Sequence, residues 1–457
     1  MAVSSLGLGS GVLTMDVLDQ LKAADEAVRI TPIERQLLTI QDKQAEMNVL
    51  DATMTNFIDS INELKAPTLY DGRSTSVAGT SVDVTASANS DIQSFTLNVI
   101  SLATNEIGES QTFASATDTG LVASAAGSMN LNVNGTDYTI NYSDTMSLND
   151  LKNEINSVAG ADVNATVVQV ASGDFRLFLN SVNSGENQAV TITDNDSGLG
   201  TQLTTLNQVQ AGTNAEFEFN GQQVFRTSNN VDDLITGYDI TLKEVGSSTV
   251  SVEQNRDEIM SRIDSFVEKY NAAMTYLSKV TKNSPDADER GLFAANSTIK
   301  SMQNTIRNAM DTLGGGVSNL YEYGFDIDKE GKMTVDKTVL NEKLDENAGN
   351  VEIFFSGGDY DNGDTTTTPI DGVFTELFTL VDNYTGYGKG IDNLKSGISD
   401  SISALEERKA TAIERLKSRY DTMAKQWGAY DSLIGRFTNS ANAFIMMVNA
   451  QSAASSS

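Results

Sequence analysis

The chain has 457 residues, a formal net charge of −31, and neither histidine nor cysteine. The negative charge argues against nucleic acid and anionic lipid as partners, because both bind basic protein faces. Without histidine and cysteine there can be no Ser-His-Asp or Cys-His nucleophilic site, no thiol redox chemistry and no usual zinc site. Among the 62 acidic residues no pair stands out as a hydrolase site, so we predict a protein that is not an enzyme and needs no cofactor.

The first 40 residues are predicted to form a flexible N-terminal arm. They carry neither the basic stretch nor the apolar run of a cleaved signal peptide, and nothing in the chain approaches the ~20 apolar residues of a membrane span. The motif Gly7-Leu-Gly9-Ser-Gly11 lacks the preceding strand and the Lys-Ser/Thr ending of a phosphate loop. We expect a flexible lead into a helix and no membrane partner.

An amphipathic helix with coiled-coil character is predicted next, because apolar residues recur in steps of three and four from Ile33 to Leu64. Thr31-Pro32 is a suitable start, since proline is tolerated in the first helical turn, and Pro67 follows the end. Residues 41–76 are assigned to this N-terminal leg helix.

Residues 77–254 are predicted to be a β-rich head. Asn134-Gly135 favours a two-residue hairpin turn that pairs Val133 with Thr136, because both turn residues tolerate positive φ. Ser147 and Asp150 then form a capping box at the start of a short helix, and further strands follow.

A second copy of this hairpin is indicated by the sequence around Asn220-Gly221. We therefore predict two related α+β modules, the first made of residues 77–112 and 204–254 and the second, residues 113–203, inserted in it. The head carries 21 acidic and 4 basic residues, so the negative charge is concentrated there.

Residues 255–420 are predicted to be a helical leg domain with one hairpin. Helices are expected from Arg256 and from Ser297, and a loop over residues 357–368. The stretch from Asp326 to Gly331 resembles the opening of a calcium loop, but its twelfth position is Lys337 instead of glutamate. A hairpin there is the favoured interpretation.

The C-terminal region contains the longest helical pattern of the chain, from Ile391 to Val448 without a proline. Its apolar residues recur about every 3.56 positions, between the periods of a supercoil and of a free helix. Residues 421–457 are assigned to a terminal helix and tail. The stretch Phe444-Ile-Met-Met-Val448 is apolar almost all round, which a solitary helix could not sustain in water.

The apolar seams of both ends could be intramolecular core, which is the usual meaning of such a pattern. Their shared period and the apolar end of the last helix favour contact between subunits. The residues predicted to make these contacts are Ile33, Leu37, Leu50, Phe57, Leu405, Leu416, Tyr420, Met423, Trp427, Ile434, Phe437 and Phe444. The predicted fold class is thus an α+β multidomain protein, with a helical leg from both chain ends and two β-rich modules between them.

The order of these segments resembles the filament cap protein of bacterial flagella, the hook-associated protein 2 family. No single motif is diagnostic, but the matching segments extend over most of the chain, and Trp427 stands where the family more often has phenylalanine. The matching segments are Gly9-Ser-Gly11 with residues 18–37, then 148–156, 175–181, 219–229, 232–237, 266–271, 323–331 and 419–427.

The resemblance implies a stool-shaped homo-oligomer, a pentamer, at the tip of the growing filament. It would retain exported flagellin and promote its folding and polymerisation, with the hook-filament junction protein and an export chaperone as further partners. It implies an extracellular location reached by the flagellar type III route. Two alternatives remain open at this point: a surface adhesin that binds host or surface glycans through the head, and another axial component such as flagellin.

Overall fold

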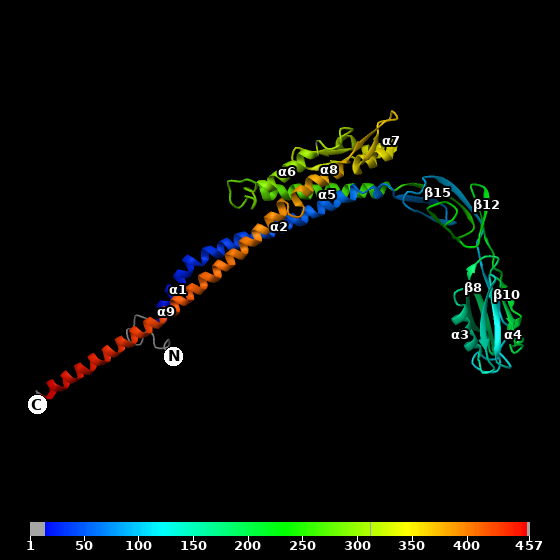
Figure 1. Ribbon diagram of the computed structural model, residues 1–457, viewed down its shortest axis with the longest axis horizontal. Coiled ribbons are helices and arrows are strands. Elements are labelled where there is room, and N and C mark those ends of the chain that lie inside the picture. The colour runs from blue at the N-terminus through cyan, green and yellow to red at the C-terminus, as the bar shows by residue number, and fades with distance from the viewer. Residues whose placement is uncertain (1–13, 311, 455–457) are drawn as a thin grey trace. The chain divides into compact units, whose positions relative to one another are not determined.

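The computed structural model describes residues 14–310 and 312–454, with helices toward both chain ends and strands between them (Figure 1). The chain divides into two compact units. We call residues 1–66 and 260–457 the leg unit, and residues 67–259 the head unit. The predicted fold class is confirmed.

Two consecutive helices begin the described part of the leg unit, α1 (Met15–Arg29) and α2 (Thr31–Leu64). The Thr14 hydroxyl caps α1 by accepting a hydrogen bond from the Val17 amide, at 3.4 Å. The helix start predicted at Thr31 is confirmed. The described part of residues 1–40, where a flexible arm was expected, is helical, because α1 buries Leu18 against α9.

The chain leaves the helical conformation earlier than the range 41–76 suggests. After Leu64 it forms the 3₁₀ turn η1 (Pro67–Leu69) and then the first strand, β1 (Arg73–Ala78). Proline at the end of a helix cannot continue its hydrogen-bond ladder, which explains the early stop.

The middle of the leg unit consists of helices and two hairpins. The helices are α5 (Arg256–Thr281), α6 (Ser297–Ala309), α7 (Lys337–Ser356) and α8 (Val373–Thr385), with the 3₁₀ turn η2 (Leu320–Tyr323). The hairpins are β16 (Phe325–Ile327) with β17 (Met333–Val335), and β18 (Gly358–Asp361) with β19 (Thr367–Ile370). The predicted helix starts at Arg256 and Ser297 and the hairpin after Tyr323 are confirmed, whereas the expected loop over 357–368 contains β18 and the start of β19.

Aromatic side chains join the helices of the leg unit. Phe266 on α5 stacks on Phe57 of α2 at 5.8 Å between ring centroids, and its edge meets Phe374 of α8 at 4.9 Å. Phe355 of α7 reaches the same Phe374 at 5.2 Å. These buried rings form one core, since aromatic pairs at such distances add to the stability gained from burial.

The last helix, α9 (Gly390–Ala454), has 65 residues and confirms the long C-terminal helix. It passes residue 420 without a break, so the helix continues across the boundary drawn there. At 1.5 Å per residue it is about 98 Å long. Glycines interrupt its side-chain pattern at positions 397, 428 and 435.

The head unit holds two hydrophobic cores. The first core lies among strands from both ends of the unit and includes the fully buried Leu97, Phe217 and Ile240. Its five-stranded sheet has the order β1-β15-β3-β11-β12, and a three-stranded sheet has the order β13-β14-β2. The strands are β2 (Val82–Ala86), β3 (Ser94–Ser101), β11 (Ala215–Phe219), β12 (Gln222–Arg226), β13 (Asn230–Val231), β14 (Tyr238–Leu242) and β15 (Gly246–Gln254).

The second core is formed by the elements that lie between β3 and β11 in the sequence, and it includes Leu131, Leu151 and Leu177. Its sheets have the orders β10-β4-β8-β7 and β6-β5-β9. The elements are β4 (Asn105–Glu109), β5 (Gly127–Val133), β6 (Thr136–Tyr142), α3 (Leu148–Ala159), β7 (Val163–Ala171), β8 (Asp174–Ser184), β9 (Val190–Asp194), α4 (Thr201–Thr204) and β10 (Asn207–Gln210).

Two strands lie outside the module to which the predicted boundaries assign them. β4 and β10 fall within 77–112 and 204–254, yet both belong to the sheet of the second core, where β4 pairs with β8. Their polar sequences give no apolar alternation from which that pairing could be predicted. The sites at which the second module joins the first therefore lie near residues 104 and 213, where Thr104 bridges Thr213.

The short-range predictions for the head are confirmed. The turn at Asn134-Gly135 has φ of 49° and 77°, and it pairs Val133 with Thr136. The capping box of α3 is present, with the Ser147 hydroxyl accepting from the Asp150 amide. The related turn at Asn220-Gly221 has φ of 49° and 81°, but the residues that follow β13 form no counterpart of α3.

Candidate functional site on the leg helices

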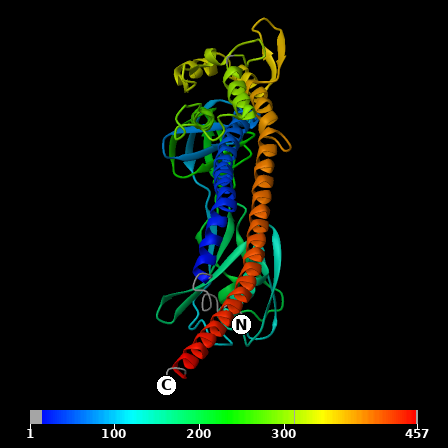
Figure 2. The ribbon, with the colours of Figure 1, turned by 90° about the vertical axis from the view of Figure 1, so that its left-hand side faces the viewer.

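The leg is organised around α9, which runs beside α1 and α2 (Figure 2). Two ion pairs link α9 to α2: Lys395 Nζ lies 2.6 Å from Asp51 Oδ2, and Lys409 Nζ lies 2.9 Å from Glu34 Oε1. Lys395 and Asp51 are separated by 344 residues in the sequence. The two ends of the chain therefore build one helical seam.

Two of the predicted contact residues lie inside the leg core. Leu50 and Phe57 are fully buried by other parts of the same chain. Their side chains cannot reach another molecule in this conformation. They stabilise the helices of the leg unit instead of forming a contact surface.

Two more predicted residues hold α1 against α9. Leu416 and Tyr420 are buried with Leu18 and Ile30 in a small cluster. The Tyr420 hydroxyl donates a hydrogen bond to Asp25 Oδ2 at 2.9 Å, and Arg419 Nη1 lies 3.0 Å from the same oxygen. Burial, and then the hydrogen bond to Asp25, raise the pKa of Tyr420. The phenol thus stays neutral and joins the two helices.

The remaining predicted residues are partly or fully open to solvent. Half-buried are Ile33, Leu37, Leu405, Met423 and Trp427. Exposed are Ile434, Phe437 and Phe444, and Phe437 exposes 72% of its surface. Exposed apolar neighbours extend this surface, which we call the apolar end of α9: Tyr430, Leu433, Ile434, Phe437, Phe444, Ile445, Met446, Met447 and Val448.

The apolar end of α9 brings together several exposed apolar side chains, whereas exposed apolar residues on an ordinary surface are scattered singly. Contiguous apolar patches on a protein surface mark sites of contact with other proteins or membranes. No helix in the described part of the chain is long and apolar enough to cross a membrane. The apolar end of α9 is a candidate contact surface because its apolar side chains are exposed.

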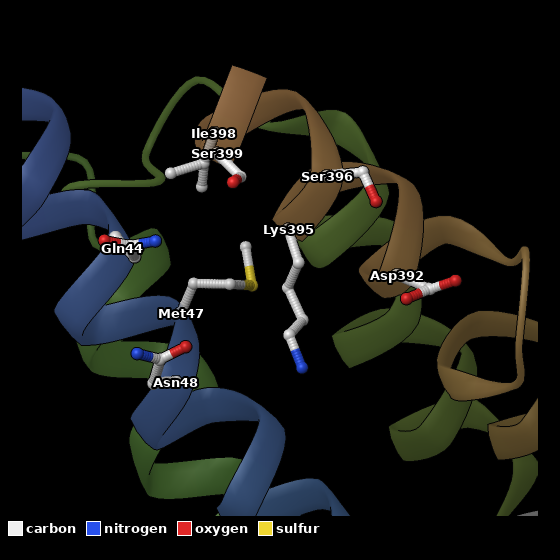
Figure 3. A pocket seen from close by; sticks show the side chains of 8 residues that line it. All are labelled: Gln44, Met47, Asn48, Asp392, Lys395, Ser396, Ile398 and Ser399. Atoms are coloured by element: carbon white, nitrogen blue, oxygen red, sulfur yellow. The ribbon is translucent and has the colours of Figure 1, made fainter. Parts of the chain in front are cut away.

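A pocket of about 280 Å³ opens between α2 and α9 (Figure 3). Met47 projects into it from α2, and Lys395 crosses it from α9. The lining is mixed polar and apolar, with serines at positions 396 and 399 and Gln44 opposite. It offers room for a side chain of a partner but no set of groups suited to a chemical step. Within residues 14–310 and 312–454, no cluster of three or more acidic, His or Cys side chains could hold a metal.

The sequence prediction missed the partner of Leu416 and Tyr420. Leu18 and Asp25 of α1, and Ile30 directly after it, contact them from the range expected to be flexible. The available signal was the spacing of Leu18, Leu21 and Asp25, which places them on one helical face. Many alanines and charged residues weaken that pattern.

Comparison with known proteins agrees with this architecture. The model of the flagellar hook-associated protein 2 N-terminus matches residues 10–106, and that of the C-terminus matches residues 212–439. Flagellar hook-associated protein 2 of Aeromonas caviae is 24% identical over 97% of this chain and 98% of its own length. The protein of the same name from Campylobacter jejuni is 25% identical over 78% of this chain, and the match spans only 64% of that relative.

A solved structure shares the fold. The crystal structure of the D1-D2-D3 domains of the flagellar cap protein FliD from Escherichia coli has a TM-score of 0.60 and 20% identity, and it covers 78% of this chain and 99% of that one. Both family models match, and they include α1, α2 and most of α9, the helices that form the leg seam. The chain belongs to the flagellar hook-associated protein 2 family.

Proposed function

We propose that this protein is the structural cap at the distal tip of the bacterial flagellar filament, where it retains exported flagellin and promotes its folding and polymerisation. The observation that carries the proposal is the match of both family models, together with the apolar end of α9. The relative from Aeromonas caviae is named flagellar hook-associated protein 2, and the solved structure from Escherichia coli is named a flagellar cap protein.

The leg supports an assembly role in physical terms. Its buried core makes α9 a stable support, and α9 carries exposed apolar side chains beyond the part that α1 covers. A cap must release and remake contacts as subunits are added. Many modest apolar contacts suit that cycle better than one tight anchor, because each can be broken separately.

The further elements of the proposal concern partners and location. The protein assembles with itself, as a pentamer, and acts with flagellin, the hook-filament junction protein and an export chaperone. It reaches the outside of the cell by the flagellar type III route. It works by binding and shaping, not as an enzyme. No observation on the head favours the adhesin alternative, and the axial alternatives lack the support that the family models give the cap.

The experiment is complementation of a flagellated strain from which this protein has been deleted. We expect flagellin to accumulate in the medium and filaments to be absent or short, with both defects reversed by the full chain. Gold labelling in electron microscopy should locate the protein at filament tips only. Labelling along the shaft, or normal filaments in the deletion strain, would exclude the cap function.

A further inference from the structure

A basic groove runs along one edge of the seam between α9 and the N-terminal helices. It contains two hollows, one of about 340 Å³ lined by Arg29, Arg415 and Arg419, and one of about 380 Å³ lined by Arg35 and Lys43. The α9 residues that line them are at positions 401, 405, 412, 415, 416 and 419. Positions 401, 405, 412, 416 and 419 recur in steps of three, four and seven, which places them along one edge of the helix, and Arg415 lies beside that edge.

Most of these cations have no partner within the described part of the chain. Arg419 pairs with Asp25. Arg29, Arg35, Lys43 and Arg415 make no ion pair with a described residue, nor does Arg408, which stands one heptad before Arg415 on the same edge. We define the basic groove by these five residues. Positive charge is thus concentrated on one edge of a chain whose net charge is −31.

The outer face of α9 carries a line of acidic residues, with the exposed Lys417 between its last two members. Asp400, Glu407, Glu414 and Asp421 are spaced seven residues apart, so they follow one line along the helix, which we call the acidic stripe. All four are exposed, and none makes an ion pair with a described residue.

The groove and the stripe have similar lengths and occupy the same segment of α9. The stripe extends over 21 residues, about 32 Å, and the α9 edge of the groove over 18 residues, about 27 Å. Glu407 precedes Arg408, and Glu414 precedes Arg415. Consecutive residues point about 100° apart around a helix, so these charges cannot pair with each other. Two parallel legs standing side by side would bring them together without an axial shift.

We infer that the acidic stripe on α9 of one copy of this chain docks in the basic groove of the next copy. The inference rests on the proposed function, because it specifies how the legs of the cap associate. The contact is heterologous, since stripe and groove are different surfaces of the same leg. Repetition by rotation then closes a ring. Opposite charges orient the approaching copies more than they strengthen the final contact.

Charge reversal in the full chain tests this contact. D400R/E407R/E414R/D421R places cations opposite the groove, and R408E/R415E places anions opposite the stripe. We expect each to raise the dissociation constant of the oligomer roughly tenfold or more at low salt, as measured by sedimentation. The combined variant should recover association. E342R on α7 and K329E on the turn between β16 and β17 reverse one exposed charge each, away from the groove and the stripe. Both controls should leave the dissociation constant of the oligomer unchanged.

Cysteine cross-linking gives a second readout, since the chain has no cysteine of its own. A mixture of E414C and R415C chains should form disulfide-linked dimers that neither variant forms alone. Unchanged association in both reversal variants would overturn the inference. So would loss of association only in the groove variant, because an acidic surface other than the stripe would then occupy the groove. Tip labelling of the unmodified chain reports separately on the cap function, so the two failures can be distinguished.

Discussion

Glu46 and Tyr276 connect α2 with α5 through a hydrogen bond from the phenol to the carboxylate, and Lys279 Nζ lies 3.0 Å from the same carboxyl group. The hydrogen bond from Tyr276 lowers the pKa of Glu46 from its usual 4.5. A carboxyl group whose pKa is lowered by folding stabilises the folded state at pH values above its unfolded pKa. That stabilisation is lost as the pH falls through the lowered pKa of the folded state.

We predict that acid will loosen α2 from α5, beginning below about pH 4.5. Hydrogen exchange of α2 and α5 amides between pH 6 and pH 3 would measure it. E46Q should show lower protection factors at pH 6 than the unmodified chain, and a smaller further decrease in protection toward pH 3. Parallel pH profiles of E46Q and the unmodified chain would contradict the assignment.

Phe57 and Phe437 test the difference between core and contact surface. F57A should lower the free energy of unfolding by about 3–5 kcal/mol, because it leaves a cavity in a fully buried aromatic cluster. F437S should leave unfolding nearly unchanged, since that ring is exposed, and should weaken self-association. Denaturant unfolding and sedimentation of both variants would separate the two roles. A large stability loss in F437S would place its ring in a core.

At the scale of elements, the hairpin of β5 and β6 depends on the backbone conformation of Gly135. Its φ is 77°, and a Cβ added there would meet no atom within 4 Å. G135A should therefore cost about 1 kcal/mol through backbone conformation alone. Thermal unfolding of the head would measure it. G221A, at the equivalent turn of β11 and β12, should cost a similar amount, and unequal costs would contradict a purely conformational origin.

The attachment of α1 to α9 is the second element with a defined weak point. L416D introduces a carboxylate among Leu18, Ile30 and Tyr420, and W427D removes a half-buried ring beside them. We predict that L416D/W427D releases α1, abolishes oligomers and motility, and leaves the head folded. Hydrogen exchange localised to α1, sizing experiments and swimming assays provide the test. Normal oligomers would contradict it.

Local signals predicted the elements whose stability is itself local. Asn-Gly turns and the capping box at Ser147 hold wherever the chain forms them, and a proline-free apolar seam leads to one long α9. The pairing of β4 with β8 and the docking of α1 depend on residues far away in the sequence, such as Phe178 opposite Glu109 and Tyr420 beside Asp25. Contacts of that kind leave no periodic pattern in either segment alone.

At the scale of the molecule, the prediction that the charge is segregated was correct in outline and incomplete in detail. Between residues 408 and 436 the chain carries seven basic and three acidic residues, against the acidic trend elsewhere. A composition averaged over α9 shows near neutrality. The helix geometry places the basic and acidic residues on different sides of α9, where they form the basic groove and the acidic stripe.

The same geometry predicts how association responds to salt. Exposed charges farther apart than about 8–10 Å are screened at physiological ionic strength, so oligomer formation should weaken as sodium chloride rises from 0.05 to about 0.5 M. Apolar contacts by Phe437 and Phe444 should remain and leave a salt-resistant component. Sedimentation across the salt series, with F437S/F444S as comparison, would resolve the two components. Association independent of salt would exclude an electrostatic contribution.

Gly428 and Gly435 lie just beyond Trp427, the last α9 residue packed against the cluster that holds α1, and before Phe437. Each glycine costs helical stability of about 1 kcal/mol relative to alanine, and the two stand seven residues apart, on the same side of the helix. The two glycines make this short stretch a point at which α9 can bend. A bend there would let the apolar end tilt while the part of α9 that packs against α1 stays in place.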